Sequence, residues 1–208
     1  MQGALFNDKY SNDYGAIMNY ARITPAAVKE NYVDIAGGDS DIDLTEAVGG
    51  VVFEDGKIDF KFTFFDRHSK EQMKNDLHGR KVRIVLENDS DFYYEGRIKC
   101  TQDNQDKSLY ELCFVAKVKP YKYERRETMH VEKVSGRQKE LTLFNSRMPV
   151  MPRITVTGKV SLAYEGSRYT MQTGVYQVPE ITLYEGHNYM KLTGEGTIKF
   201  EYRKGQLI

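Results

Sequence analysis

The stretch KNDLHGRKVRIVLENDSDFYYEGRI, residues 74–98, decides the fold. Its first residues complete a helix, because Gly79 is a strong helix stop. Two segments rich in β-branched and aromatic residues follow, Lys81–Leu86 and Phe92–Cys100, and the polar run Glu87–Asp91 separates them. This pattern predicts two strands joined by a turn. The stretch contains almost none of the side chains that a catalyst needs, so it indicates a structural framework.

The segment just before this stretch predicts the one convincing helix of the chain. Ser69 and Gln72 have the spacing of a capping box. Met73 and Leu77 stand four residues apart and therefore share one face of the helix. We expect a helix of about ten residues that packs on a sheet.

Strand patterns lie on both sides of the helix. Val51–Phe53 is the expected hairpin partner of the strand that follows it, because Asp55-Gly56 is a strong turn pair. After the second strand, the polar residues Thr101–Lys107 predict a loop and Leu109–Val118 predicts a long strand. The strand that follows Asp55-Gly56 has period-two alternation, with apolar residues at Ile58, Phe60, Phe62 and Phe64.

The first fifty residues carry a weaker signal. Residues 1–31 predict a short strand or an arm, and Asp43–Val48 predicts one helical turn with Asp43 as its cap. Asp39, Asp41 and Asp43 alternate as calcium ligands do, but the glycine and terminal glutamate of an EF-hand loop do not follow. A polar loop explains these residues without a metal.

The C-terminal part predicts short strands only. Turn glycines recur at roughly eight to twelve residues, the spacing of a β-sandwich or closed barrel. Gly194-Glu195-Gly196 is expected to be a turn between two strands. The fold class predicted is mainly β, with an N-terminal β-sandwich or sheet that carries one short helix. The expected C-terminal strands are residues 140–144, 153–156, 160–164, 169–172, 180–183, 189–192 and 197–202.

Charge divides the chain into two parts. The 208 residues include 30 Lys and Arg and 30 Asp and Glu, a net charge of zero. From Met1 to Glu124 the balance is 17 basic against 22 acidic residues, and from Arg125 to Ile208 it is 13 against 8. This shift supports two domains, residues 1–124 and 125–208. Because no overall basic excess is available to neutralise phosphates, nucleic acid is a poor candidate for a partner.

Several other classes of protein are disfavoured. No signal peptide and no stretch of eighteen apolar residues is present, so we expect a soluble protein without a membrane partner. Cys100 and Cys113 are too few for a disulfide scaffold and are expected to be free thiols in a reducing cytosol.

No catalytic motif is present either. The histidines have no partner at metal-ligand spacing, and neither a phosphate-binding glycine loop nor a nucleophile elbow occurs. We expect no catalytic residue, no cofactor and no metal. A hydrolase is the least favoured function.

The abundant tyrosines can be interpreted in two ways. Tyrosine at the edge of a small sandwich suits a subunit interface, where one end of the ring is apolar and the other is wet. It also suits stacking on sugars. Tyr184 and Tyr189 are the candidates for contact with a glycan or a protein partner.

Five segments, in order, resemble the distal tail (Dit-like) proteins of long-tailed phages and prophages of Gram-positive bacteria. They are VDIAGGDSDIDLTEAVGG at residues 33–50, KIDFKFTF at 57–64, the LHGRKVRIVLENDSDFYYEGRI run at 77–98, KPYKYE at 119–124 and GTIKFEYRKGQL at 196–207. None of them is a catalytic motif. The sequence departs from the family pattern at Lys119, where aspartate is common, and in its short, divergent C-terminal part.

The resemblance implies a virion structural protein of the tail tip, made in the bacterial host cytoplasm. It implies an N-terminal domain that assembles as a ring, typically a hexamer, around a channel, and a galectin-like C-terminal β-sandwich outside it. The implied partners are the tail tube protein, a tail-associated hub or lysin protein, and a receptor-binding protein or host cell-wall glycan. The alternative function is a carbohydrate-binding module for attachment to the host cell wall.

Overall fold

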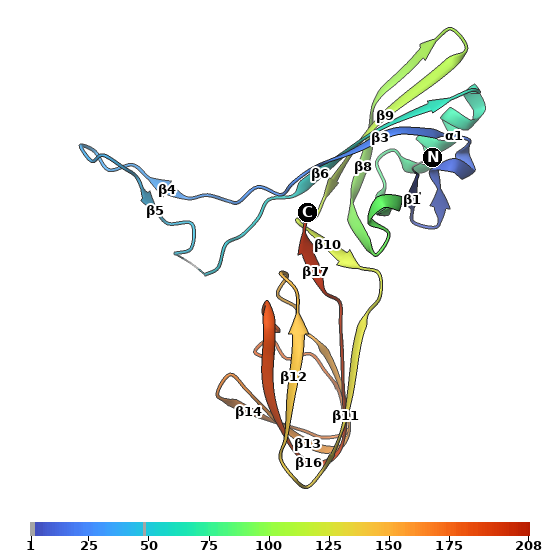
Figure 1. The fold of residues 1–208 in the computed structure, drawn as a ribbon. Helices are drawn as coiled ribbons and strands as arrows, with labels where there is room; N and C mark the ends of the chain where they lie inside the picture. The colour runs from blue at the N-terminus through green and yellow to red at the C-terminus, as the bar shows by residue number, and fades with distance from the viewer. Residues whose placement is uncertain (1–2, 48) are drawn as a thin grey trace. The chain divides into compact units, whose positions relative to one another are not determined.

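The computed structural model describes residues 3–47 and 49–208. It is mainly β, as the sequence predicts, and contains several antiparallel sheets (Figure 1). The chain divides into two compact units. Unit 1 consists of Met1–Lys122 with Leu207–Ile208, and unit 2 consists of Tyr123–Gln206. Each unit has a hydrophobic core of its own.

Unit 1 is built on one antiparallel sheet. Two further short strands, β10 (Tyr121–Glu124) and β17 (Gly205–Leu207), pair with each other off the main path, and β10 also pairs with β8. A 3-10 helix, η1 (Ser11–Tyr14), follows the first two strands. Along the path the strand order is β2 (Lys9–Tyr10), β1 (Ala4–Phe6), β7 (Lys81–Leu86), β8 (Phe92–Asp106), β9 (Leu109–Val118), β6 (Gly56–Phe64) and β3 (Ile17–Thr24).

The predicted alternation in β6 is confirmed and forms the centre of the unit 1 core. Ile58, Phe60, Phe62 and Phe64 are at most 1% exposed. Phe62 makes an edge contact with Phe114 of β9, with ring centroids 6.2 Å apart. Aromatic pairs in this geometry add to the free energy gained by burial alone.

The expected hairpin of Val51–Phe53 with β6 is wrong. In the structure β6 pairs with β9 on one side and β3 on the other, and Phe53 forms only an isolated bridge to Val28. Gly56 is the first residue of β6 and not part of a turn. A Cβ at Gly56 would lie 2.0 Å from Ile208 Cδ1, because the Ile208 side chain packs against the strand at this glycine, and a side chain there would displace it.

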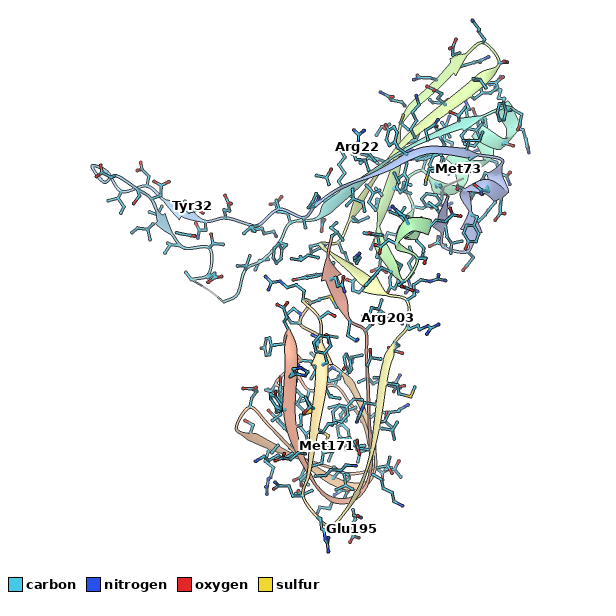
Figure 2. The ribbon with its side chains drawn as sticks, viewed as in Figure 1. Arg22, Tyr32, Met73, Met171, Glu195 and Arg203 are labelled. Carbon is cyan, nitrogen blue, oxygen red and sulfur yellow. The ribbon has the colours of Figure 1, made fainter. Side chains whose placement is uncertain are left out.

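The predicted helix is α1 (Arg67–Leu77), but its cap is not Ser69. Asp66 is the N-cap, and its Oδ1 accepts a hydrogen bond of 2.8 Å from the Ser69 backbone N–H. Met73 and Leu77 are buried on the face that packs on the sheet, and Figure 2 shows Met73 in that position. The glycine predicted to stop the helix, Gly79, has φ of +78°.

The polar segment predicted as a loop, Thr101–Lys107, is mostly strand. β8 continues to Asp106, and its second half forms a long hairpin with β9. A β-bulge lies between Cys100 and Gln102. Nearly every residue at this end of the hairpin is exposed. The strands here have no apolar face to bury, so they do not need apolar and polar residues in alternation. For that reason the pattern did not reveal the strand.

Unit 2 is a single sheet folded onto itself around one core. Its strands are β11 (Thr128–Ser135), β12 (Lys139–Asn145), β13 (Arg153–Tyr164), β14 (Ser167–Met171), β15 (Gly174–Tyr176) and β16 (Gly186–Tyr202). The first half of β16 pairs with β12 and its second half with β11. Likewise, β13 pairs with β15 in its first half and with β14 in its second. One layer of the sandwich consists of β12, the first half of β16, the second half of β13 and β14. The other layer consists of β11, the second half of β16, the first half of β13 and β15.

Two pairs of predicted strands are in fact single long strands. Residues 153–156 and 160–164 both belong to β13, and residues 189–192 and 197–202 both belong to β16. The predicted turn Gly194-Glu195-Gly196 is therefore wrong. Residues 180–183 are not a strand, apart from an isolated bridge between Leu183 and Val150, and β11 was not predicted.

Candidate functional site: the arm and the aromatic strip

Residues 25–55, here called the arm, leave unit 1 between β3 and β6 (Figure 1). At its base the Lys29 N–H donates to Val52 O and the Glu54 N–H donates to Ala27 O. Further out, two short antiparallel strands pair, β4 (Tyr32–Val33) and β5 (Ile42–Asp43). No described residue of the arm is buried. Since an arm without a core does not stabilise its own fold, its exposed side chains are available to another surface.

The predicted helical turn at Asp43–Val48 is a single hydrogen-bonded turn over its described part, in which the Ala47 N–H donates to Leu44 O at 3.0 Å. It does not continue as a helix among the described residues, and Val48 lies outside them. Asp43 ends β5 just before this turn. Its Oδ1 accepts a hydrogen bond from the Thr45 N–H at 2.9 Å, so Asp43 caps a single turn and not a helix. A hydrogen bond from the Thr45 side chain and then the one from the Thr45 N–H lower the pKa of the Asp43 carboxyl.

The arm has one apolar and one acidic face. Val33 and Ile42 are Cα partners on one side of the β4–β5 pair, and the apolar residues Ile35 and Leu44 lie two positions beyond them in the chain. These four side chains are between 36% and 47% exposed. Tyr32, labelled in Figure 2, is paired with Asp43 on the opposite face. The negative charges of Asp43 and then Glu30 raise the pKa of the Tyr32 phenol.

Charge distinguishes the arm from the rest of its unit. Residues 25–55 contain eight Asp and Glu residues and one Lys, a net charge of −7. The remainder of unit 1 contains 16 Lys and Arg against 13 Asp and Glu, a net charge of +3. An acidic arm and a basic body are complementary between two copies of one chain.

An open sheet edge lies at the root of the arm. β3 is the last strand on its side of the sheet, and among the described residues its only partner is β6. Its outer edge therefore presents unpaired backbone groups along eight residues. Tyr20 on this edge is 38% exposed, and the Arg22 guanidinium lies 5.2 Å from its ring centroid. Such an edge can be completed by a strand of another molecule.

A second exposed surface lies on unit 2, on the outer face of β12 and β16. Phe144 and His187 are Cα partners on the two strands, and Tyr189 is two residues further along β16. The ring centroids of Phe144 and His187 are 5.5 Å apart, and those of His187 and Tyr189 are 6.3 Å apart. We call these three residues the aromatic strip. Phe144 is 50% exposed and Tyr189 is 72% exposed.

Of the two tyrosines singled out from the sequence, only Tyr189 belongs to the strip. Tyr184 is 58% exposed and lies on the loop before β16, and among the described residues no ring contact joins it to the strip. That loop is held by the buried Asn188, whose Oδ1 accepts from the Tyr184 N–H and whose Nδ2 donates to Tyr184 O. Phe144 and His187 were not predicted, because their contact depends on the register of strands distant in sequence.

Two further histidines have hydrogen-bond partners within the fold. His78 Nδ1 accepts from the Cys100 N–H, and His130 Nε2 lies 2.9 Å from Glu132 Oε1. Burial raises the pKa of both free thiols, Cys100 and Cys113. Within residues 3–47 and 49–208, no three His, Cys, Asp or Glu side chains are grouped as around a metal ion. No helix in the described part of the chain is long and apolar enough to span a membrane.

Comparison with known proteins finds similarity in structure and not in sequence. No protein-family model and no curated protein matches the sequence. Among solved structures, the crystal structure of the SPP1 Dit protein (gp 19.1) matches with a TM-score of 0.71 and 15% sequence identity, over 98% of this chain and 99% of that chain. The chain has the fold of SPP1 Dit.

The match covers residues of both units. SPP1 Dit is described as a paradigm of the hub adsorption apparatus in phages that infect Gram-positive bacteria. The resemblance to Dit-like proteins that the sequence motifs predicted is therefore confirmed for the fold. At 15% identity, the comparison with SPP1 Dit concerns the fold alone.

Proposed function

We propose that the protein is a structural component of a phage tail tip that assembles as a ring and joins the tail tube to the hub and adsorption proteins. The fold of SPP1 Dit supports this role. The observation that carries the proposal is the arm, which has exposed apolar side chains, a net charge of −7 and no core of its own. Such a segment is stabilised when it is buried against a neighbour.

In this proposal the arm of one copy lies on unit 1 of the next. Its apolar face, formed by Val33, Ile35, Ile42 and Leu44, loses contact with water, which contributes about 25 cal/mol for each Å² buried. Its acidic residues meet the net positive body of the next copy. Because the arm and its acceptor are different surfaces, the contact is heterologous, and repetition of such a contact closes a ring if the rotation allows. A hexamer is the proposed ring size.

Residues 1–124 are proposed to form the ring, and residues 125–208 to form a galectin-like domain outside it. The proposed neighbours are the tail tube protein, a tail-associated hub or lysin protein and a receptor-binding protein. The role needs neither a catalytic residue nor a cofactor, and we propose that the protein is not an enzyme. The proposed location is the virion tail tip, after synthesis in the host cytoplasm.

Removal of the arm tests the proposal. Thr24 and Lys57 are Cα partners on adjacent strands, so an Asn-Gly turn can replace residues 25–56 without opening the sheet. We expect the wild type to form a ring at high concentration in light scattering and electron microscopy, and the shortened chain to remain monomeric. Circular dichroism checks that the shortened chain keeps its β structure.

A point substitution gives a matched comparison. Ile42→Asp places a charge on the apolar face of the arm, and Leu109→Asp places one on a similarly exposed site at the β8–β9 hairpin; the two side chains are 47% and 38% exposed. Ile42→Asp should weaken association by about tenfold or more, equivalent to about 1.4 kcal/mol, and Leu109→Asp should not. Rings of unchanged stability without the arm would refute its role. A wild type that never associates, even with its tail neighbours, would refute the ring.

A further inference from the structure

A row of four basic side chains crosses one face of the unit 1 sheet. Lys81 of β7 is the Cα partner of Arg97 of β8, and Arg97 is also the partner of Lys117 of β9. Lys117 is in turn the partner of Lys57 of β6. Because residues paired in this way point to the same side of a sheet, the four side chains stand next to one another. We call these four residues the basic row.

The basic row faces away from the core. Each of its members has a neighbour in the chain that belongs to the core and is at most 2% exposed: Val82, Ile98, Val118 and Ile58. Since successive side chains of a strand point to opposite faces, the row lies on the solvent face. The side chain of Lys117 is 75% exposed and that of Lys57 is 49% exposed. Lys81 and Arg97 are exposed as well, so the row is open to a ligand.

The basic row is unfavourable for the sheet itself. Like charges directly opposite each other on adjacent strands destabilise a sheet. Two carboxylates partly offset the charge, because Asp59 lies 3.0 Å from Lys57 Nζ and Asp55 lies 3.4 Å from Lys117 Nζ. Exposed ion pairs of this kind contribute at most about 1 kcal/mol each. A row of cations that packing does not require indicates a ligand with negative charge.

The spacing of the row matches a line of phosphates. Adjacent strands are about 4.8 Å apart, so the four side chains extend over about 14 Å. Double-stranded DNA carries one negative charge for about every 1.7 Å of its axis, or about 3.4 Å along each strand. The row can therefore contact several phosphates of one backbone at once. Lys99, two residues after Arg97 on the same face of β8, extends the positive surface.

We propose that the basic row binds the phosphate backbone of double-stranded DNA without reading its sequence. Contacts with phosphates position a protein on a duplex but carry no sequence information directly. The sequence alone disfavours nucleic acid, because the chain as a whole has no basic excess. The strand register, however, gathers four of the 30 basic residues in one line with no acidic side chain between them. This role goes beyond the tail-tip role and does not depend on the arm.

Two other ligands fit the row less well. Single-stranded nucleic acid binds by stacking on aromatic rings as well as by charge. The next row along the sheet consists of Lys99, Val115 and Asp59, which offer no ring. The acidic arm of a second copy carries exposed apolar side chains, such as Val33 and Ile42, that need an apolar acceptor. Val115 is the one apolar side chain that this neighbouring row presents to them.

The test uses the full-length chain and a labelled DNA duplex of about 20 base pairs, with fluorescence anisotropy measured from about 50 to 200 mM salt. Four phosphate contacts predict a slope of about −3.6 for the logarithm of the binding constant against the logarithm of the salt concentration. Lys57→Gln/Lys117→Gln should weaken binding about tenfold or more at low salt and make the slope shallower by about two. Lys57→Arg/Lys117→Arg keeps the charges and should retain both the affinity and the slope.

A matched control separates the basic row from the charge of the whole chain. Lys29→Gln/Lys107→Gln removes the same charge from two exposed sites, in the arm and in the turn between β8 and β9, and should leave the affinity and the slope unchanged. Thermal unfolding checks that each variant is folded. Poly-glutamate and oligo-dT serve as competing probes, and both should bind more weakly than the duplex.

The proposal is overturned if the duplex does not bind saturably at low salt, or if the control loses as much affinity as Lys57→Gln/Lys117→Gln. Tighter binding of poly-glutamate or oligo-dT than of the duplex would also overturn it. Loss of self-association in Lys57→Gln/Lys117→Gln, with DNA binding unchanged, would contradict it as well, since the row would then be a subunit contact.

Discussion

At the scale of single residues, Asp103 joins the exposed β8–β9 hairpin to helix α1. Its two carboxylate oxygens accept hydrogen bonds of 2.6 Å from Lys70 Nζ and Lys74 Nζ. Lys70 is only 7% exposed, and its ammonium group also lies 5.7 Å from the Tyr110 ring. Partial burial tends to raise the pKa of Asp103, but the hydrogen bonds from Lys70 and then Lys74 outweigh it, and the pKa is lowered.

Asp103→Asn should therefore destabilise unit 1. We expect the free energy of unfolding to fall by about 1–2 kcal/mol at pH 7, because Lys70 and Lys74 each lose one of two carboxylate partners and keep Glu71. Since the folded pKa is below the unfolded one, the contribution of Asp103 is present above the ordinary pKa of aspartate, about 4, and disappears as the pH falls through the folded value. Chemical denaturation at pH 7 and pH 3 measures both effects.

Asp106→Asn is the matched control. It makes the same change of charge on the same hairpin, at an exposed residue three positions further along β8. We expect Asp106→Asn to change the free energy of unfolding by less than about 0.5 kcal/mol. Equal losses for Asp103→Asn and Asp106→Asn, or a loss for Asp103→Asn that does not decrease between pH 7 and pH 3, would contradict the role assigned to Asp103.

At the scale of elements, the bend shared by β13 and β16 makes unit 2 a sandwich. Gly158 of β13 has φ of +93° and is the Cα partner of Gly196; Gly194, the partner of Val160, has φ of +109°. A Cβ at Gly194 would lie 2.4 Å from Lys159 O. Both strands therefore turn together where only glycine fits. Figure 2 shows Glu195 at this bend, between the half of β16 that pairs with β12 and the half that pairs with β11.

Gly194→Ala should strain this bend. Positive φ alone costs about 1–2 kcal/mol in a residue with a side chain, and the contact with Lys159 O adds to it. Gly136→Ala is the control, because Gly136 has φ of +77° but no atom within 4 Å of an added Cβ. We expect the midpoint temperature of thermal unfolding of unit 2 to fall clearly more for Gly194→Ala than for Gly136→Ala. Equal shifts would mean that the close approach of the strands has no energetic effect.

At the scale of the whole molecule, two cores predict two folding units. The core of unit 1 includes Leu112 and the core of unit 2 includes Leu192, and both side chains are fully buried. We propose that the chain unfolds in two transitions, one for each unit, because each core is closed over its own strands. The two transitions are expected for the two compact units, Met1–Lys122 with Leu207–Ile208 and Tyr123–Gln206.

Leu112→Ala and Leu192→Ala form a matched pair for calorimetry. Each should cost about 2–5 kcal/mol through lost burial and a residual cavity. We expect Leu112→Ala to lower the transition of unit 1 alone and Leu192→Ala that of unit 2 alone. A single transition that both substitutions shift equally would show that the chain folds as one cooperative unit.

The features that the sequence predicted depend on residues close together in the chain, whereas those that it did not predict depend on residues far apart in the chain. The sequence by itself determined the alternation of β6, helix α1, strands β7 and β9, the mainly β class and the resemblance that the fold comparison confirmed. These follow from contiguous residues, whose period and turn chemistry act locally.

Only the tertiary structure decided the partners of β6, the bend at Gly194, the polar end of β8 and the strip of Phe144, His187 and Tyr189. A glycine before a strand predicts a turn from sequence alone, yet Gly56 is a packing site for Ile208 and Gly194 bends a continuous strand. The physical reason is that strand pairing and close backbone approach depend on residues far away in the chain, and no local pattern records which of them will meet.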